Sequence, residues 1–267
     1  MKNALYIIMV IGCLAILVVS HISYQSKLDN IAADAKNAVI AVDESDQKSP
    51  STKNESTNDS TTNNNNTGSG DIAELTGLLG EIPTKEDELT IAYFGSRSIE
   101  NDGFADVSWP RKLDDLLMRI TDVNSTIFNV NSLSSAEVIQ SEYLEEVIQW
   151  NPDLILFEPF ILNDNGVVLI SDSLIYIEQM MDSFSEELEE TTVVVMPPNP
   201  IYSPQLYYTQ VQELESYAAQ QNYLYADHWQ AWPDIQSEEI RDYLEEGRPN
   251  EAGHQVWAEF MYDYLTE

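Results

Sequence analysis

Polar side chains that could carry chemistry gather in three short blocks of this chain. The first is residues 95–98, Gly-Ser-Arg-Ser, the second is residues 158–166, Glu-Pro-Phe-Ile-Leu-Asn-Asp-Asn-Gly, and the third is residues 245–254, Glu-Glu-Gly-Arg-Pro-Asn-Glu-Ala-Gly-His. The single cysteine, Cys13, lies in an apolar N-terminal stretch, and histidine is scarce. We therefore expect no thiol nucleophile, no disulfide, no metal centre and no cofactor, which leaves hydroxyl, carboxylate, amide and imidazole groups.

Short apolar runs alternate with amphipathic stretches from residue 86 to residue 267. The runs predict strands at residues 89–94, 126–130, 153–157, 192–196 and 223–226. The stretches after them predict helices at residues 109–120, 135–150, 172–190, 205–220, 237–246 and 251–264. This alternation is typical of a three-layer α/β/α sandwich with a five-stranded parallel sheet. Sites in such sheets lie beyond the carboxyl ends of the strands, where the first two blocks stand.

The first 26 residues predict one transmembrane helix. Residues 4–20 carry no charge, and the apolar stretch extends to about residue 24, close to the roughly 20 residues that a membrane-spanning helix needs. We interpret residues 1–26 as an uncleaved signal anchor; a lipoprotein signal ending at Cys13 and a cleaved signal peptide are the alternatives. With Lys2 on the inner side, the prediction is a single-pass protein of the cell membrane whose C-terminal domain is extracytoplasmic.

A polar segment separates this helix from the folded domain. Residues 27–85 are rich in Ser, Thr and Asn, with an Asn run at 63–66. Residues 43–70 contain almost no apolar side chain and so cannot offset the entropy of ordering by burial. We therefore predict a disordered tether at residues 27–85, followed by a domain at residues 86–267.

The charge of the chain restricts its partners. Twelve basic residues against 46 acidic ones give a formal net charge of −34. From Lys85 onward there are 7 basic and 36 acidic residues, so most of this charge lies in the predicted domain. A surface this negative repels phosphate backbones, so nucleic acid is not an expected partner, and contact with the membrane is expected through the N-terminal helix only.

The three blocks, in this order and spacing, resemble those of the SGNH (GDSL-type) hydrolases. The shared features are a Gly-Ser turn after the first strand, an Asn-Asp pair after the third, and Pro-Asn-x-x-Gly-His before a Trp-containing last helix; they span about residues 89–265. The sequences FEPxxLNDNG (157–166) and DHWxAWPD (227–234) are similar to a group of Gram-positive surface members. The resemblance implies a flavodoxin-like SGNH fold and a serine ester hydrolase that needs no cofactor and no metal.

The resemblance also implies roles for individual residues. In the family, a serine at a strand-to-helix turn is acylated, and backbone N–H groups with an Asn side chain form the oxyanion hole. Carried over, Ser96 is the predicted nucleophile and Asn163 the predicted oxyanion donor. Further residues are expected to contact substrate: Arg97 (at the family's serine position), Ser98, Asn131 (with Ser132, near the family's second glycine), Asp164 and Arg248.

The family's base is absent from its usual position. Glu245-x-x-Arg248 stands where the family has Asp-x-x-His, and a guanidinium stays protonated, so it cannot act as a base. The implied base is then His254 or His228, oriented by Glu245 or Asp227. Both histidines also fit plain packing roles, one at a helix start and one between Asp227 and Trp229.

Two functions follow from the resemblance. The first is a cell-surface ester hydrolase acting on acyl or acetyl esters of envelope polysaccharide or lipid, with a small-molecule or cell-wall ester as substrate. The alternative is a catalytically degenerate domain that binds a ligand or partner at the cell surface without turnover; a purely structural role at the surface is a third. A histidine nitrogen within hydrogen-bond reach of Ser96 or Ser98 favours the enzyme.

Overall fold

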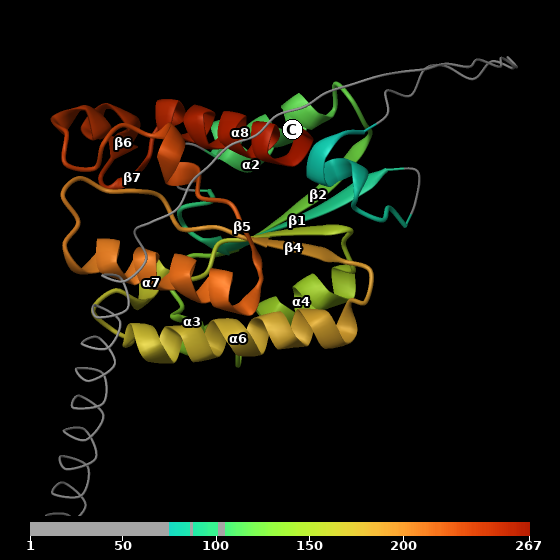
Figure 1. Ribbon diagram of the computed structural model, residues 1–267, viewed down its shortest axis with the longest axis horizontal. Coiled ribbons are helices and arrows are strands. Elements are labelled where there is room, and N and C mark those ends of the chain that lie inside the picture. The colour runs from blue at the N-terminus through green and yellow to red at the C-terminus, as the bar shows by residue number, and fades with distance from the viewer. Residues whose placement is uncertain (1–74, 86–87, 101–104) are drawn as a thin grey trace, which may run out of the picture. The chain divides into compact units, whose positions relative to one another are not determined.

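The computed structural model describes residues 75–85, 88–100 and 105–267, and within them the five predicted strands form one parallel sheet (Figure 1). The strands follow the order β2-β1-β3-β4-β5: β1 Leu89–Ser96, β2 Val123–Val130, β3 Leu154–Phe157, β4 Thr192–Val195 and β5 Leu224–Tyr225. All four pairings are parallel. The inner strands β1 and β3 are buried almost throughout, which explains why their sequences are continuously apolar instead of alternating.

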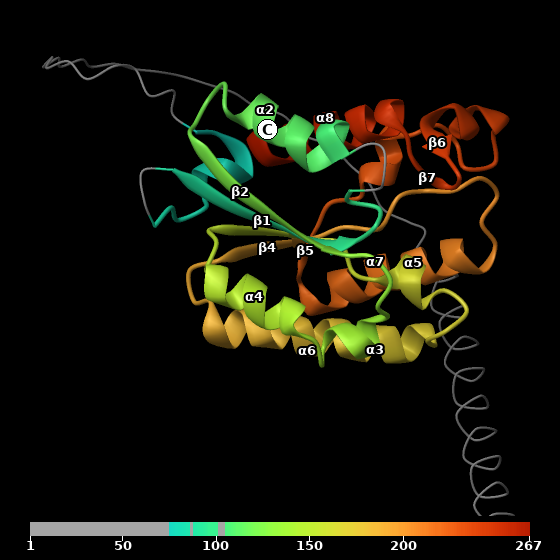
Figure 2. The ribbon, with the colours of Figure 1, turned by 180° about the vertical axis from the view of Figure 1, so that it is seen from behind.

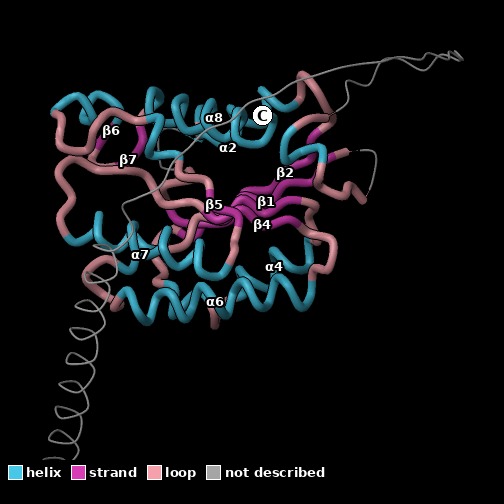
Figure 3. Tube along the Cα trace, in the orientation of Figure 1, coloured by secondary structure: helices cyan, strands magenta, loops and turns pink. Residues whose placement is uncertain are grey.

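Helices cover both faces of this sheet, so the predicted three-layer arrangement is present (Figures 1, 2 and 3). One face carries α2 Trp109–Leu117, α8 Glu251–Thr266 and the 3₁₀ helix η1 Gly77–Gly80. The opposite face carries α3 Ser135–Val138, α4 Glu142–Trp150, α6 Ile170–Glu187 and α7 Leu206–Gln221. The remaining short elements are η2 Ala105–Val107, α5 Ile161–Asp164, η3 His228–Ala231, η4 Glu238–Tyr243, β6 Leu244–Glu245 and β7 Arg248–Pro249.

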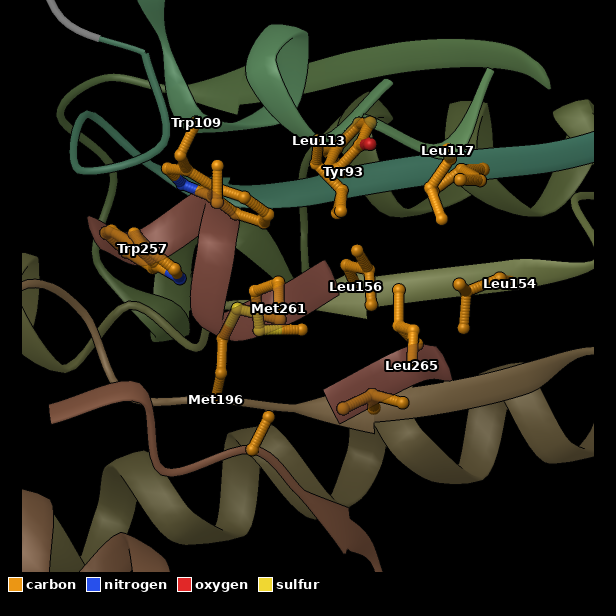
Figure 4. Close-up of a cluster of buried hydrophobic side chains, with 14 of the residues drawn as sticks. Tyr93, Trp109, Leu113, Leu117, Leu154, Leu156, Met196, Trp257, Met261 and Leu265 are labelled. Carbon is orange, nitrogen blue, oxygen red and sulfur yellow. The ribbon is translucent and has the colours of Figure 1, made fainter. Parts of the chain in front are cut away.

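Each face of the sheet has its own apolar core. Beneath α2 and α8, Trp109 stacks on Trp257 with ring centroids 4.9 Å apart, and aliphatic side chains such as Leu156 and Met261 fill the space toward the sheet (Figure 4). On the other face, Phe94 and Phe157 stack at 5.4 Å and pack with further aromatic and aliphatic side chains of α6 and α7. The sheet is therefore anchored on both sides by close-packed aromatic rings, which fixes the ends of its strands.

The predicted helix at 135–150 is two helices. Ser134 and Glu137 form a capping box at the start of α3, and the Ser141 side chain accepts a hydrogen bond from the Tyr143 N–H at the start of α4. A serine that caps a new helix competes with continuation of the old one, so the chain bends between Val138 and Ser141. Asn151 then ends α4 in the left-handed conformation at φ 52°.

The predicted helix at 237–246 is wrong beyond residue 243. After η4, Glu246 and Gly247 both have positive φ, 51° and 80°, and they form the two-residue turn of a β6–β7 hairpin. Two successive positive φ values match the tight turns that join antiparallel strands and are incompatible with a helix. Glu245 and Arg248 consequently face each other as cross-strand partners.

The packed part of the chain begins earlier than residue 86. Leu79 and Ile82 are buried in the core under α8, and the Lys85 side chain donates to the carbonyls of Asn151 and Pro152. Residues 75–85, predicted as the end of the tether, therefore belong to the domain. The predicted anchor at 1–26 lies outside the described residues.

Within the described part of the chain, no helix is both long enough and apolar enough to span a membrane.

Candidate active site

The carboxyl ends of β1 and β3 approach each other very closely. Ser96 is the last residue of β1, and Glu158 comes directly after β3, where its N–H donates to the Phe94 carbonyl at 2.8 Å. A Cβ at Gly95 would lie 2.7 Å from the Glu158 Cβ and 2.8 Å from the Glu158 carbonyl oxygen. Only glycine allows this approach, so Gly95 is what lets Glu158 sit beside the serine turn.

Ser96 is held by the Glu158 carboxyl group through two hydrogen bonds. Its Oγ donates to Glu158 Oε2 at 2.8 Å, and its N–H donates to the same oxygen at 2.9 Å. The Ser98 N–H donates to Ser96 Oγ at 3.2 Å, and the two serine hydroxyls lie 3.1 Å apart. The Ser96 hydroxyl is therefore oriented toward both Glu158 Oε2 and Ser98 Oγ. All three side chains are at most 1% exposed.

The Glu158 carboxyl group is fully buried, and the shift of its pKa is caused by burial and by its hydrogen bonds to Ser96. Burial raises its pKa to about 8, against the lowering effect of the two Ser96 hydrogen bonds. Its second oxygen, Oε1, has no hydrogen-bond partner among the residues that the structure describes. The nearby Tyr207 has a pKa raised by burial and then by the Glu158 charge, and its hydroxyl donates to the Asn199 carbonyl at 2.9 Å. With this pKa, the Glu158 carboxyl group is mostly protonated, and therefore uncharged, at pH 7.

Asn163 and Asp164, on α5, hold the connection between β2 and α3. The Asn163 Nδ2 donates to the carbonyls of Leu133 at 2.9 Å and Val130 at 3.3 Å. The buried Asp164 carboxylate accepts from the Ser135 N–H at 2.8 Å and from its Oγ at 2.6 Å. Asn131 is exposed in the same connection. In this conformation Asn163 therefore orders the loop after β2, at the same edge of the sheet as Ser96.

The ring nitrogens of His228 are bonded within the core. Nε2 lies 2.8 Å from the Pro197 carbonyl, and Nδ1 accepts from Trp232 Nε1 at 3.0 Å, so the proton of the neutral ring is on Nε2. The ring stacks on Trp257 with centroids 3.9 Å apart, and burial lowers its pKa to about 3. The Pro197 carbonyl therefore orients this ring. Asp227, one of the two carboxylates expected to orient the base, instead accepts a hydrogen bond from Gln230 Nε2 at 3.0 Å.

His254 lies at the first turn of α8 and faces α2. Its Nδ1 accepts from the Trp109 N–H at 3.2 Å, and burial, followed by the charge of Lys112, lowers its pKa to about 4. The side-chain hydrogen bonds of Ser96 and Ser98 involve Glu158 and these two serines themselves. The structure thus does not place either imidazole on a serine, although it was the histidines that the sequence favoured as bases.

The residues at the expected Asp-x-x-His position form the β6–β7 hairpin. Glu245 is exposed and Arg248 is half-buried. The Gly247 carbonyl accepts from Asn199 Nδ2 at 3.0 Å, which ties the hairpin to the loop after β4. Arg97, next to Ser96, is also half-buried. Across the described residues, no cluster of His, Cys, Asp and Glu side chains is arranged to hold a metal ion.

Glu158 is the site residue that sequence reasoning missed. Its block had been noted, but only for Asn163 and Asp164. A signal was present, because a carboxylate directly after the fully apolar run 154–157 must enter the protein at the end of a buried strand. Asn199 carries a similar signal between two prolines after β4; it is fully buried, and its Oδ1 has no partner within the described structure.

Comparison with known proteins identifies the fold. No protein-family model matches the sequence, and no curated protein matches it. A protein ascribed to the lipolytic G-D-S-L family from Desulfitobacterium hafniense is 16% identical with a TM-score of 0.56, over 66% of this chain and 99% of that one. A G-D-S-L family member from Veillonella parvula is 18% identical with a TM-score of 0.55, over 67% and 99%.

A third similar structure is a variant of an acetyl-xylooligosaccharide esterase from Geobacillus. It is 11% identical with a TM-score of 0.54, over 67% of this chain and 94% of that one. The matches span nearly the whole of these proteins, so the resemblance extends to the complete sheet and both helical layers. The domain therefore has the fold of the GDSL (SGNH-type) lipolytic hydrolases.

Proposed function

We propose that the chain is an ester hydrolase with Ser96 as its nucleophile. The observation that carries this proposal is the position of Ser96: it ends β1 at the carboxyl edge of a parallel sheet, with its Oγ 2.8 Å from a carboxyl group that can accept its proton. Sites of α/β sheets lie at this edge, and a serine becomes a nucleophile only beside a group that takes its proton. The fold shared with lipolytic proteins and an esterase is consistent with this chemistry.

The proposed substrates are acyl or acetyl esters of envelope polysaccharide or lipid. One structural neighbour is described as an acetyl-xylooligosaccharide esterase and others as lipolytic, which supports esters of both kinds. The predicted anchor at 1–26 would hold the domain at the outer side of the cell membrane, next to such polymers. The high negative charge disfavours anionic substrates, so neutral acetylated sugars suit the domain better than anionic lipids.

The proposed reaction is acyl transfer through Ser96. Its Oγ attacks the ester carbonyl carbon, and the alcohol leaves from an acyl-enzyme that water then hydrolyses. Asn163 is the proposed oxyanion donor, acting from the same edge of the sheet. To donate to an oxyanion, its Nδ2 must give up one of its present acceptors, of which the Val130 carbonyl at 3.3 Å is the longer contact.

A second candidate is a binding domain that has lost catalysis. It is favoured by the two histidines, whose described hydrogen bonds go to Pro197, Trp232 and Trp109 and not to either serine. Arg248, in place of the family's histidine, would then contribute a positive charge to a ligand-binding edge.

Hydrolysis by the full-length chain distinguishes the two candidates. Turnover of p-nitrophenyl acetate, p-nitrophenyl butyrate and acetylated xylo-oligosaccharide should fall about a thousandfold or more in Ser96→Ala. A fluorophosphonate probe should label wild type at Ser96, identified by peptide mass spectrometry. Ser185→Ala, which removes an exposed hydroxyl on α6, is the matched control and should keep wild-type turnover. Turnover that survives in Ser96→Ala would exclude Ser96 as nucleophile. No turnover and no label in wild type would leave the binding domain as the function.

A further inference from the structure

We propose that the Glu158 carboxylate, and not an imidazole, is the general base that deprotonates Ser96. The inference deepens the proposed function and rests on it. Its basis is geometric: Glu158 Oε2 lies 2.8 Å from Ser96 Oγ, within the range required for direct proton transfer. The Ser98 Oγ lies 3.1 Å from Ser96 Oγ, and the Ser98 N–H donates to that oxygen at 3.2 Å.

The backbone holds this pair in place. β1 and β3 are hydrogen-bonded neighbours with Phe94 opposite Phe157, and Glu158 N–H continues the ladder to the Phe94 carbonyl. One carboxylate oxygen accepts both the N–H and the Oγ–H of Ser96, so the orientation of the carboxyl group is fixed relative to the serine. A base on a rigid strand end can be positioned more accurately than one on a loop.

The second oxygen of Glu158 takes no part in holding Ser96. Oε1 is buried and has no hydrogen-bond donor, in a residue that is 0% exposed. Leaving a buried polar atom unpaired costs about 1–3 kcal/mol, so a purely structural role would be served better by a side chain without it. A catalytic carboxyl group, in contrast, needs an oxygen that can exchange a proton with a reacting group.

Glu158 alone can accept and return every proton that the reaction transfers. As Ser96 Oγ bonds to the ester carbonyl carbon, its proton moves to Glu158, and the carbonyl π electrons move to the oxygen. When the tetrahedral intermediate collapses, the C–O bond to the alcohol breaks, and Glu158 returns the proton to the leaving oxygen. In the second half, Glu158 takes a proton from water, whose oxygen attacks the acyl carbon, and the proton passes to Ser96 Oγ as the carboxylic acid leaves.

The neighbours of Glu158 determine the pH at which it can act. Ser96 and Ser98 face it from the β1 turn, Tyr207 from α7, and Arg97 stands next to Ser96 in the chain. Burial raises the pKa of Glu158 to about 8 and no charged side chain contributes to that shift. A general base must be deprotonated in the free enzyme, so kcat/KM should rise with pH through about 8 and then level off. Because burial lowers the pKa of His228 to about 3 and that of His254 to about 4, either imidazole as the base would leave kcat/KM level from pH 5 upward.

The test is the pH dependence of kcat/KM for p-nitrophenyl acetate in the full-length chain from pH 5 to 10. We compare wild type with Glu158→Gln, Glu158→Asp and the exposed control Glu213→Gln, after checking each fold by circular dichroism. Glu158→Gln should lower kcat/KM about 100- to 10,000-fold and abolish the inflection near pH 8. Glu158→Asp should keep some activity with a displaced inflection, and Glu213→Gln should match wild type.

The outcomes separate this inference from the proposed function. If wild-type turnover depends on Ser96 but shows no inflection near pH 8, or survives in folded Glu158→Gln, the function stands and Glu158 is not the base. If Glu158→Gln does not fold, the wild-type profile and Glu158→Asp decide in the same way. If wild type has neither turnover nor a label on Ser96, the proposed function fails, and the assignment of a base fails with it.

Discussion

The buried Glu158 carboxyl group should make the domain less stable at alkaline pH. Its pKa is about 8 in the folded protein, against 4.5 for an ordinary glutamate, because burial penalises the charged form. Between these two values the folded state binds the proton and the unfolded state does not. The stabilisation is therefore fully present below pH 4.5 and is lost as pH rises through 8.

The structure also gives the size of this effect. Each pH unit between the two pKa values is equivalent to about 1.4 kcal/mol, so the loss approaches about 5 kcal/mol by pH 9. Glu158→Gln removes the titration while keeping an oxygen that can accept from Ser96. We expect its free energy of unfolding to lie within about 1 kcal/mol of the wild-type value at pH 4.5 and to exceed it by several kcal/mol at pH 9.

Urea unfolding of both proteins at pH 4.5, 6, 7.5 and 9 measures this difference directly. The difference between variant and wild type cancels the contribution of the many surface carboxylates, which titrate in both proteins. Glu213→Gln, which removes an exposed carboxylate, should show no such alkaline gain. A difference between Glu158→Gln and wild type that stays constant from pH 4.5 to 9 would refute a raised pKa at Glu158.

Three further predictions concern the surroundings of the site. Burial lowers the pKa of His228 to about 3 and that of His254 to about 4, so the stability that each neutral imidazole contributes should be fully present above pH 6.5 and be lost as pH falls through these values. Urea unfolding of His254→Gln between pH 7 and pH 4 should therefore show a smaller loss of unfolding free energy than wild type. Gly95→Ala should lower the free energy of unfolding by about 1–3 kcal/mol, because its methyl group meets the Glu158 backbone, and should reduce kcat more than KM changes. Trp257→Ala should cost about 3–5 kcal/mol in urea unfolding, since it removes the ring stacked on both Trp109 and His228.

Each of these predictions has a result that contradicts it. Equal acid sensitivity of His254→Gln and wild type would show that this imidazole titrates normally in the fold. A fully stable and active Gly95→Ala would mean that β1 and the segment after β3 can separate without affecting the site. For Trp257→Ala, the matched control is Tyr264→Ala, which removes a less buried aromatic ring on the same helix. An equal loss of unfolding free energy in both variants would mean that the ring stacking at Trp257 adds no stability.

The sheet could be predicted from the sequence because its signals are local. Short continuous apolar runs such as 154–157 are typical of inner parallel strands, and helices of the right length separate them. The misses arose where local signals compete. Ser141 lies in a helical pattern yet starts a new helix, and the pair Glu246-Gly247 interrupts another with a turn that requires two positive φ values.

The site was harder to predict because its central contact is not local. Ser96 and Glu158 are 62 residues apart and meet only because β1 pairs with β3. The block that contains Glu158 was visible, but sequence alone does not show which of its polar residues turns toward the serine. Likewise, His228 and His254 have the right chemistry for a base, and only their tertiary contacts show that Pro197, Trp232 and Trp109 bind them.

The described chain enters the domain at the end of the sheet that lies opposite the serine. The Thr76 hydroxyl donates to the Thr266 carbonyl at 2.8 Å, and Lys85 reaches residues 151 and 152, just before β3 begins. Residue 75 and the C-terminus are thus neighbours, and Lys85 lies at the amino edge of the sheet, whereas Ser96 ends β1 at the opposite edge. A short linker that joins residues 75 and 267 should therefore give a circular permutant, with new termini in a distant surface loop, that keeps both the fold and the site.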